Sequence, residues 1–339
     1  MVYELDKHGV TQSQLINFLK CRQYSKLNLA GWTTMRTSQP MLFGEMAHSI
    51  LEDIYTEVKD GRKDVPNEKE IHIRIDVLSR KVSKDSGQRA DQDFYDKLEY
   101  NSALLDAVLP HYFKYWNKED FGKIKWVELE KEFKFPLDLG ANNIVTIRGK
   151  RDAMYEMSKN NYLFETKTKS QIDESTITEL LAFDFQTDLY SIAVQHDYGT
   201  TPAGCRYNII RRPGNRIGKT ETLLSFTKRV SQEVASKPEY YFVRYKIEIS
   251  KKKLSDFKQE LISIVKEFQD WQEGRLPTYK NTHSCVNRYG TCQYLGICSN
   301  GDYTGFYQRK TVHPELSISM NGGSDKHGTT KPTVKVARR

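Results

Sequence analysis

Apolar residues recur along the chain at spacings that separate helices from strands. Apolar side chains three and four positions apart predict helices that each bury one face. The first follows a capping box at Thr11–Gln14 and ends near Cys21, and residues 59–95 are polar enough for loops and amphipathic helices. The other predicted helices cover residues 43–58, 95–116, 175–196 and 254–271.

Alternating and apolar stretches between these helices predict the strands of one sheet. They cover residues 126–135, 144–149, 151–156, 162–166, 204–211 and 239–249. A hairpin is expected around Asn160–Asn161, and Leu180, Phe183, Ile192 and Ala193 are expected to pack inward from the helix over 175–196. The pattern therefore predicts an α/β fold, with a mixed sheet core flanked by helices.

Two carboxylates and a lysine fall on neighbouring predicted strands. Asp152 follows Gly149 by three residues, and Lys167 follows Glu165 by two. Residues i and i+2 of a strand share a face, so Glu165 and Lys167 point the same way. Carboxylate oxygens suit Mg²⁺ or Mn²⁺, which keep several waters for substrate and nucleophile. A lysine beside such an ion can steady an attacking water and the charge that develops on a phosphate.

Three further polar residues lie on predicted helices. His48 is on the side of the helix over 43–58 that faces away from its apolar stripe, and Gln186 and Tyr190 are one helical turn apart. Taken singly, each motif has an ordinary structural interpretation: a surface ion pair for the E-x-K, a structural histidine, and a half-buried polar pair. Their order along the chain makes one shared site the better interpretation.

Five cysteines carry the second chemical signal. Cys285, Cys292 and Cys298 lie in one stretch of fourteen residues. This stretch is rich in turn-forming residues and too short for a packed element, so it needs an internal cross-link. Four thiolates can hold a tetrahedral zinc or an iron–sulfur cluster, and zinc sites tend towards closer pairs than these gaps of six and five residues. A disulfide framework is disfavoured because the chain is long, the cysteine number is odd, and no apolar leader opens the sequence. Cys205 is interpreted as a small buried residue.

The ordered set resembles the PD-(D/E)XK nuclease superfamily, and within it the RecB-like exonucleases. The resemblance runs from about Ser13 to Cys298 and implies a restriction-endonuclease-like core. It implies that His48, Asp152 and Glu165 hold Mg²⁺ or Mn²⁺, and that Lys167 is catalytic. The G-x-x-D strand and the Q-x-x-x-Y helix of that branch correspond here to Gly149–Asp152 and Gln186–Tyr190. Gln186 and Tyr190 would hold the lysine or the scissile phosphate.

Many members of that branch also carry a [4Fe–4S] cluster on one N-terminal and three C-terminal cysteines. The resemblance implies that Cys21 joins Cys285, Cys292 and Cys298 as its ligands, so that the iron–sulfur segment joins the N- and C-terminal regions. The family spacing is C-x₂-C-x₅-C, whereas the first gap here is six residues. Structural zinc remains the alternative.

Charge and composition fit an enzyme that acts on nucleic acid. The chain of 339 residues has 52 basic and 44 acidic residues, a net charge of +8. One nuclease domain is predicted over 1–316, followed by a basic, apolar-poor and disordered tail over 317–339. No apolar run is long enough for a membrane span. A cytoplasmic location is expected, which would be the cytoplasm of the host if a phage encodes the protein.

The predicted function is metal-dependent hydrolysis of DNA from its ends, preferably single-stranded ends, in recombination, replication or repair. Two alternatives remain open. One is a DNA-end-binding or recombination module that works with a helicase or annealing partner, and the other is a structure- or site-specific endonuclease of the same fold. The sequence has no G-x-x-x-x-G-K-[ST] motif, so unwinding would have to come from another chain.

Overall fold

The computed structural model describes residues 3–35, 38–86, 91–287, 290–309, 311–313 and 316. Its helices are α1 (Leu5–His8), α2 (Gln12–Lys20), α3 (Arg22–Leu29), α4 (Gln39–Lys59), α5 (Glu68–Ser86), α6 (Gln92–Tyr115), α7 (Asn117–Asp120), α8 (Ile177–Leu181), α9 (Phe185–Tyr198), α10 (Leu223–Ser236), α11 (Pro238–Tyr241), α12 (Lys251–Gln272) and α13 (Leu295–Asn300). Its strands are β1 (Val10–Thr11), β2 (Trp32–Thr34), β3 (Lys125–Asp138), β4 (Ile144–Met157), β5 (Asn160–Lys169), β6 (Gly204–Arg211), β7 (Phe242–Glu248), β8 (Val286–Asn287), β9 (Gly290–Thr291) and β10 (Phe306–Gln308).

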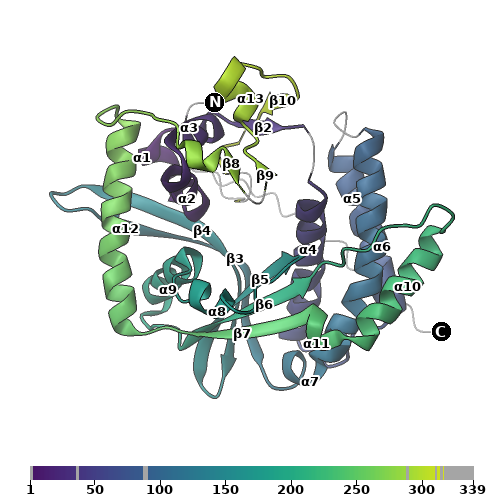
Figure 1. Cartoon of the computed structure of the whole chain (residues 1–339). Coiled ribbons are helices and arrows are strands. Elements are labelled where there is room, and N and C mark those ends of the chain that lie inside the picture. The colour runs from purple at the N-terminus through teal and green to yellow at the C-terminus, as the bar shows by residue number, and fades with distance from the viewer. Residues whose placement is uncertain are drawn as a thin grey trace.

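The main sheet has six strands in the order β1-β4-β5-β6-β7, with β3 on the other edge of β4. β1 runs parallel to β4 and β5 runs parallel to β6, whereas the other pairs are antiparallel. The predicted α/β fold with a mixed sheet flanked by helices is thus confirmed. Helices α4, α5, α6 and α10 cover one face, and α2, α9 and α12 cover the other (Figure 1).

Several predicted boundaries are wrong in detail. β4 is one strand where two were predicted, because the chain stays extended through Gly149 and Lys150. The predicted helix over 175–196 is broken between α8 and α9, since Asp184 caps α9 by accepting a hydrogen bond from the Thr187 N–H. At that break Leu180 and Phe183 are 64% and 85% exposed, so they do not pack inward, whereas Ile192 and Ala193 are buried.

The structure also differs from the prediction at one hairpin turn and around one strand. The tip of the β4–β5 hairpin is Ser158–Lys159, both with positive φ, rather than Asn160–Asn161. The predicted strand over 239–249 begins as α11, and helix α10 was not predicted at all. The predicted disordered tail, 317–339, lies outside the described residues.

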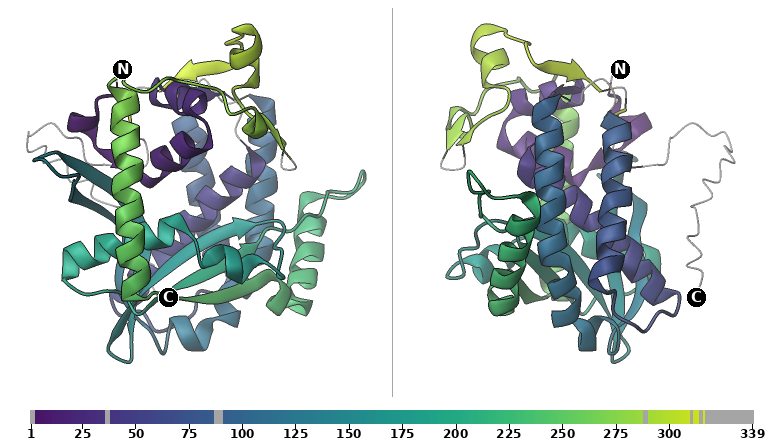
Figure 2. Two further views of the ribbon diagram at one scale, coloured as in Figure 1. Left: turned by 60° about the vertical axis from the view of Figure 1, so that its left-hand side comes forward. Right: turned by 90° about the vertical axis from the view of Figure 1, so that its right-hand side faces the viewer.

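The C-terminal segment packs against the N-terminal helices (Figure 2). β10 pairs antiparallel with β2, and a small core of Leu27, Tyr294 and Ile297 joins the two regions. The Asn281 N–H lies 3.3 Å from Cys21 Sγ, across 260 residues of sequence. The N-terminal and C-terminal parts of the chain are therefore in direct contact. Across the described residues, every helix is either too short or too polar to cross a membrane.

Candidate active site

The β4–β5 hairpin brings the two predicted carboxylates together. Its register pairs Ala153 with Phe164, which places Asp152 opposite Glu165 at the next position. Asp152 Oδ2 accepts a hydrogen bond of 2.9 Å from the Thr166 N–H, and this bond fixes its side chain beside β5. Glu165 is only 3% exposed. The hairpin thus supplies one rigid, largely dehydrated pair of carboxylates.

Helix α9 completes the surroundings of Glu165. Lys167 Nζ donates to Glu165 Oε1 and, at 3.0 Å, to Gln186 Oε1. Gln186 Nε2 in turn donates to Glu165 Oε1 at 2.8 Å and contacts the Tyr190 hydroxyl at 3.0 Å. The structure therefore brings together Glu165, Lys167, Gln186 and Tyr190.

Helix α4 brings His48 to the other side of the carboxylates. His48 Nδ1 lies 3.7 Å from Asp152 Oδ2. The helix approaches β5 closely at Gly44, where an added Cβ would lie 2.9 Å from Thr168 Oγ1. Glycine one turn before His48 is what permits this approach.

Glu130 on β3 is a functional candidate that the sequence analysis missed. It lies opposite Asp152, between the register pairs Leu129–Ala153 and Lys131–Arg151, and its φ is 45°. Ligand atoms of His48, Glu130 and Asp152 all lie within 4.8 Å of one another, a group that could hold a metal ion. The available signal was the alternation Glu128, Glu130, Glu132 on the strand that pairs with the G-x-x-D strand.

Burial and neighbouring charges set the protonation of the site. Burial and the charge of Asp152 raise the pKa of Glu165 to about 8, although Lys167 and His48 oppose this shift. Burial lowers the pKa of His48, but Asp152 and Glu130 outweigh it and the net shift is upward. Burial also lowers the pKa of Lys167, but the negative charges of Glu165 and Asp152 outweigh burial and raise this pKa above its usual value. The lysine is therefore an ammonium group at neutral pH.

The chemistry of this donor set fits a hard divalent cation. Carboxylate oxygens and one imidazole nitrogen are ligands that Mg²⁺ and Mn²⁺ accept. The Lys167 ammonium group and the Tyr190 hydroxyl stand beside the carboxylates and can bind water or phosphate oxygen, whereas Gln186 already directs its N–H groups at Glu165 and Tyr190.

Four cysteines meet at a different place, between the N-terminal helices and the C-terminal segment. One small cavity is lined by Cys21, Cys285, Cys292 and Cys298, together with Lys20 and Lys280. Within the described ranges, no three of these sulfurs approach within 4.8 Å of one another. Cys205 stands apart on β6, where it is 1% exposed, as its interpretation as a buried residue requires.

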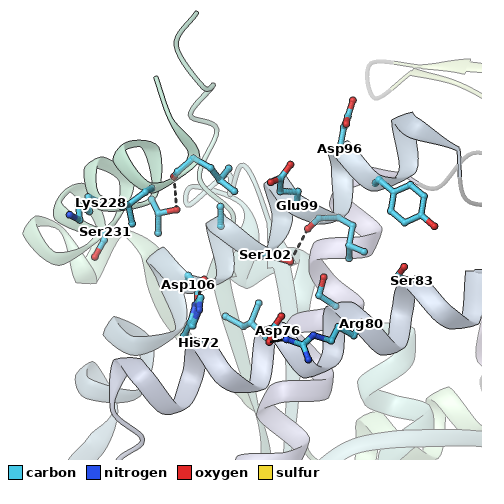
Figure 3. Close-up of a pocket in the computed structure, with 18 of the residues that line it drawn as sticks. His72, Asp76, Arg80, Ser83, Asp96, Glu99, Ser102, Asp106, Lys228 and Ser231 are labelled. Atoms are coloured by element: carbon cyan, nitrogen blue, oxygen red, sulfur yellow. Dashed lines mark hydrogen bonds and ion pairs between the residues drawn. The ribbon is translucent and has the colours of Figure 1, made fainter. Parts of the chain in front are cut away.

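A cavity of about 910 Å³ lies away from both sites, between α5, α6 and α10 (Figure 3). Its walls hold His72, whose Nδ1 is 2.9 Å from Asp106 Oδ2, and the pair of Asp76 and Arg80. None of the predicted site residues lines this cavity.

Comparison with known proteins identifies the family. Residues 10–299 match the PD-(D/E)XK nuclease superfamily, and the chain belongs to this superfamily. No curated protein sequence matches it significantly. A crystal structure described as a "putative exonuclease" from Eubacterium rectale is similar, with 11% identity, a TM-score of 0.45, and coverage of 88% of this chain and 95% of that one. The crystal structure of SSO0001 has 12% identity and a TM-score of 0.26, covering 64% and 86%. Both scores are too low to assign function.

Proposed function

We propose that the protein is a metal-dependent DNA exonuclease of the RecB-like branch of its superfamily. One observation carries this proposal: residues from three separate elements, α4, the β4–β5 hairpin and α9, converge on the same pair of carboxylates. His48, Asp152 and Glu165 would hold one or two Mg²⁺ or Mn²⁺ ions, with Glu130 as an additional ligand. When bound, such an ion lowers the pKa of a coordinated water and neutralises phosphate charge.

The remaining groups have roles that their positions define. Lys167 would orient the attacking water and stabilise charge on the phosphate, since its ammonium group lies beside the carboxylates. Gln186 holds Lys167 and Glu165 through its two amide atoms, so it fixes the lysine in place. Tyr190 would support Gln186 and the scissile phosphate.

The proposed exonuclease activity requires that the protein act at DNA ends. The basic net charge supports a phosphate backbone as substrate, and single strands would present unstacked bases to aromatic side chains. We expect faster hydrolysis of end-labelled linear DNA than of closed circles in Mg²⁺ or Mn²⁺, with none in EDTA. Rapid cutting of closed circles at defined sites would instead favour the endonuclease alternative. Tight end binding without hydrolysis would favour a recombination module that acts with a helicase or annealing partner.

We also propose that Cys21, Cys285, Cys292 and Cys298 hold a [4Fe–4S] cluster. Support comes from their arrangement around one cavity, although they come from opposite ends of the sequence. The cluster would be structural, because it would fasten the N-terminal helices to the C-terminal segment and hydrolysis needs no redox step. Four thiolates could also hold zinc, so metal analysis decides between the two.

A further inference from the structure

A second polar pocket opens at the end of β5, the strand that carries Glu165 and Lys167, and of its neighbour β6. Its walls include Ser170 after β5, Arg211 and Arg212 at the end of β6, and Lys237 and Tyr240 near α11. The volume of the pocket is about 470 Å³.

The parallel pairing of β5 and β6 sets the distance from this pocket to the active site. Lys167 pairs with Ile209 and Lys169 pairs with Arg211, and the Arg212 N–H donates to the Lys169 carbonyl oxygen at 2.9 Å. Paired residues of neighbouring strands share a face. With a rise of about 3.3 Å per residue and strands about 4.8 Å apart, the backbone of Arg211 is roughly 8 Å from that of Lys167. The Arg211 edge of the pocket therefore lies on the order of one nucleotide from the backbone of Lys167, and Arg212, the next residue, turns towards the other face of the sheet.

Arg211 and Arg212 each use only part of their hydrogen-bonding capacity within the protein, and the Arg212 side chain also contacts the Tyr100 hydroxyl. Arg211 is 5% exposed, and its guanidinium packs 4.2 Å from the ring centroid of Tyr240. One of its five N–H groups is bonded to Glu174, a surface residue with a side chain that is 63% exposed. The Nε atoms of both Arg211 and Arg212 have no hydrogen-bond partner among the described residues. Arg211 is buried and Arg212 is half-buried, and both Nε atoms are shielded from solvent, so an anion would reach these guanidinium groups through their terminal N–H groups.

Two carboxylates also line the pocket and limit its charge. Glu233 already accepts hydrogen bonds from Asn215 Nδ2 at 2.9 Å and from the Tyr241 hydroxyl at 2.7 Å, and Glu239 is exposed. Against them stand Arg211, Arg212 and Lys237, of which Lys237 Nζ lies 3.9 Å from Glu233 Oε1 and Arg211 pairs with Glu174 outside the lining. The cations exceed the carboxylates in the lining, and the ring of Tyr240 is 46% exposed beside them. An aromatic face next to cationic donors suits a nucleotide, with its base stacked and its phosphate bonded.

We propose that this pocket binds a phosphate of the DNA strand about one nucleotide from the scissile bond, an assignment that rests on the proposed nuclease function. The phosphate is either the terminal one of the strand or an internal one of its backbone. In both cases Arg212 and Lys237 contact it directly and Arg211 fixes the orientation of the pocket wall.

The test is DNA binding by the full chain in EDTA, where no hydrolysis occurs. Short single strands labelled internally carry a 5′-phosphate, a 3′-phosphate or two hydroxyl ends. Arg212→Gln and Lys237→Gln are compared with Lys228→Gln, which removes the same charge from α10 at the other cavity (Figure 3). Lys237 is exposed, so Lys237→Gln is expected to fold, and its DNA affinity tests the pocket assignment if Arg212→Gln unfolds.

We expect Arg212→Gln to raise the Kd by about tenfold and to reduce the slope of log Kd against log salt by about 0.7, as the loss of one single-strand phosphate contact implies. A loss confined to one phosphorylated strand identifies a terminal phosphate, and an equal loss on all three identifies an internal one. Binding by both pocket variants that matches that of Lys228→Gln overturns the pocket assignment. Failure of the wild type to hydrolyse DNA in Mn²⁺ is a separate result, and it would overturn only the proposed nuclease function.

Discussion

Glu165 has the most buried carboxyl group of the candidate site. It is 3% exposed, faces Asp152 across the hairpin, and accepts hydrogen bonds from Lys167 and Gln186. Burial and the charge of Asp152 raise the pKa of this carboxyl group, so they favour its neutral form when no cation is bound. If Glu165 is a ligand as proposed, a divalent cation would have to displace a proton from this carboxyl group.

The first prediction concerns the pH dependence of Mn²⁺ binding, which the proton on Glu165 would cause. Below pH 8 the apparent affinity for Mn²⁺ should rise with pH, by up to about tenfold per unit for one displaced proton, and above pH 8 it should level off. Calorimetric titration in two buffers of different ionisation enthalpy measures the protons released. Glu165→Gln should retain only the pH dependence that His48 contributes. An affinity for Mn²⁺ that is flat between pH 6 and 8 in the wild type would contradict the raised pKa.

The second prediction concerns Glu130, whose positive φ is a strained conformation for a residue with a side chain. If it is a ligand, Glu130→Gln should weaken Mn²⁺ binding by about tenfold or more, and the fold should remain intact. Glu132→Gln on the same strand is the matched control. Equal affinities for Mn²⁺ in the two variants would remove Glu130 from the site.

At the scale of elements, a close contact between β3, β4 and α9 positions the site. An added Cβ at Gly149 would lie 2.5 Å from Phe133 Cζ, and the Phe133 ring packs edge-on against Tyr190 at 5.5 Å. The glycine three residues before Asp152 is therefore required by packing. It leaves room for the tip of the Phe133 ring, which contacts Tyr190 of α9.

The third prediction tests this contact. Gly149→Ala should reduce the free energy of unfolding by about 1–3 kcal/mol, as overpacking does. Adding Phe133→Leu should recover part of that loss, because it removes the clashing ring atoms. Denaturant unfolding of the single and double variants measures both effects. A fully stable Gly149→Ala would show that the ring moves aside freely.

The elements of the site were predictable because each carries a strong local pattern. The long amphipathic helix α4 and the hairpin strands follow periodicities that fix which face His48 and Glu165 occupy. Other features depend on contacts that no local pattern encodes. Glu130 becomes part of the site only through the pairing of β3 with β4, and the break before α9 depends on the cap at Asp184. Leu180 and Phe183 are apolar at helical spacing, yet the break leaves them exposed.

At the scale of the whole molecule, contacts between the two ends of the sequence hold the N-terminal helices in place. The Asn281 side chain and the Ser284 hydroxyl both donate to the Lys20 carbonyl oxygen, next to Cys21. A metal centre at the four cysteines would close a loop of more than 200 residues, which stabilises chiefly by reducing the entropy of the unfolded chain.

The fourth prediction concerns this centre. Protein purified without oxygen should be brown and contain about four irons per chain. Changing Cys21, Cys285, Cys292 or Cys298 to serine should remove the colour and lower the melting temperature, whereas Cys205→Ser should retain the colour. A colourless protein with one zinc per chain would establish the alternative.

The central claim is that the carboxylates of the β4–β5 hairpin and Lys167 perform metal-dependent hydrolysis. The most direct measurement compares degradation of end-labelled linear DNA by the wild type, Asp152→Asn and Lys167→Ala in Mn²⁺, with Lys159→Ala at the hairpin tip as the matched control. We predict that the wild type and the control degrade DNA, that the two site variants lose at least about a hundredfold in rate, and that both variants remain folded and still bind DNA. Wild-type rates in Asp152→Asn or Lys167→Ala would contradict the assignment of the active site.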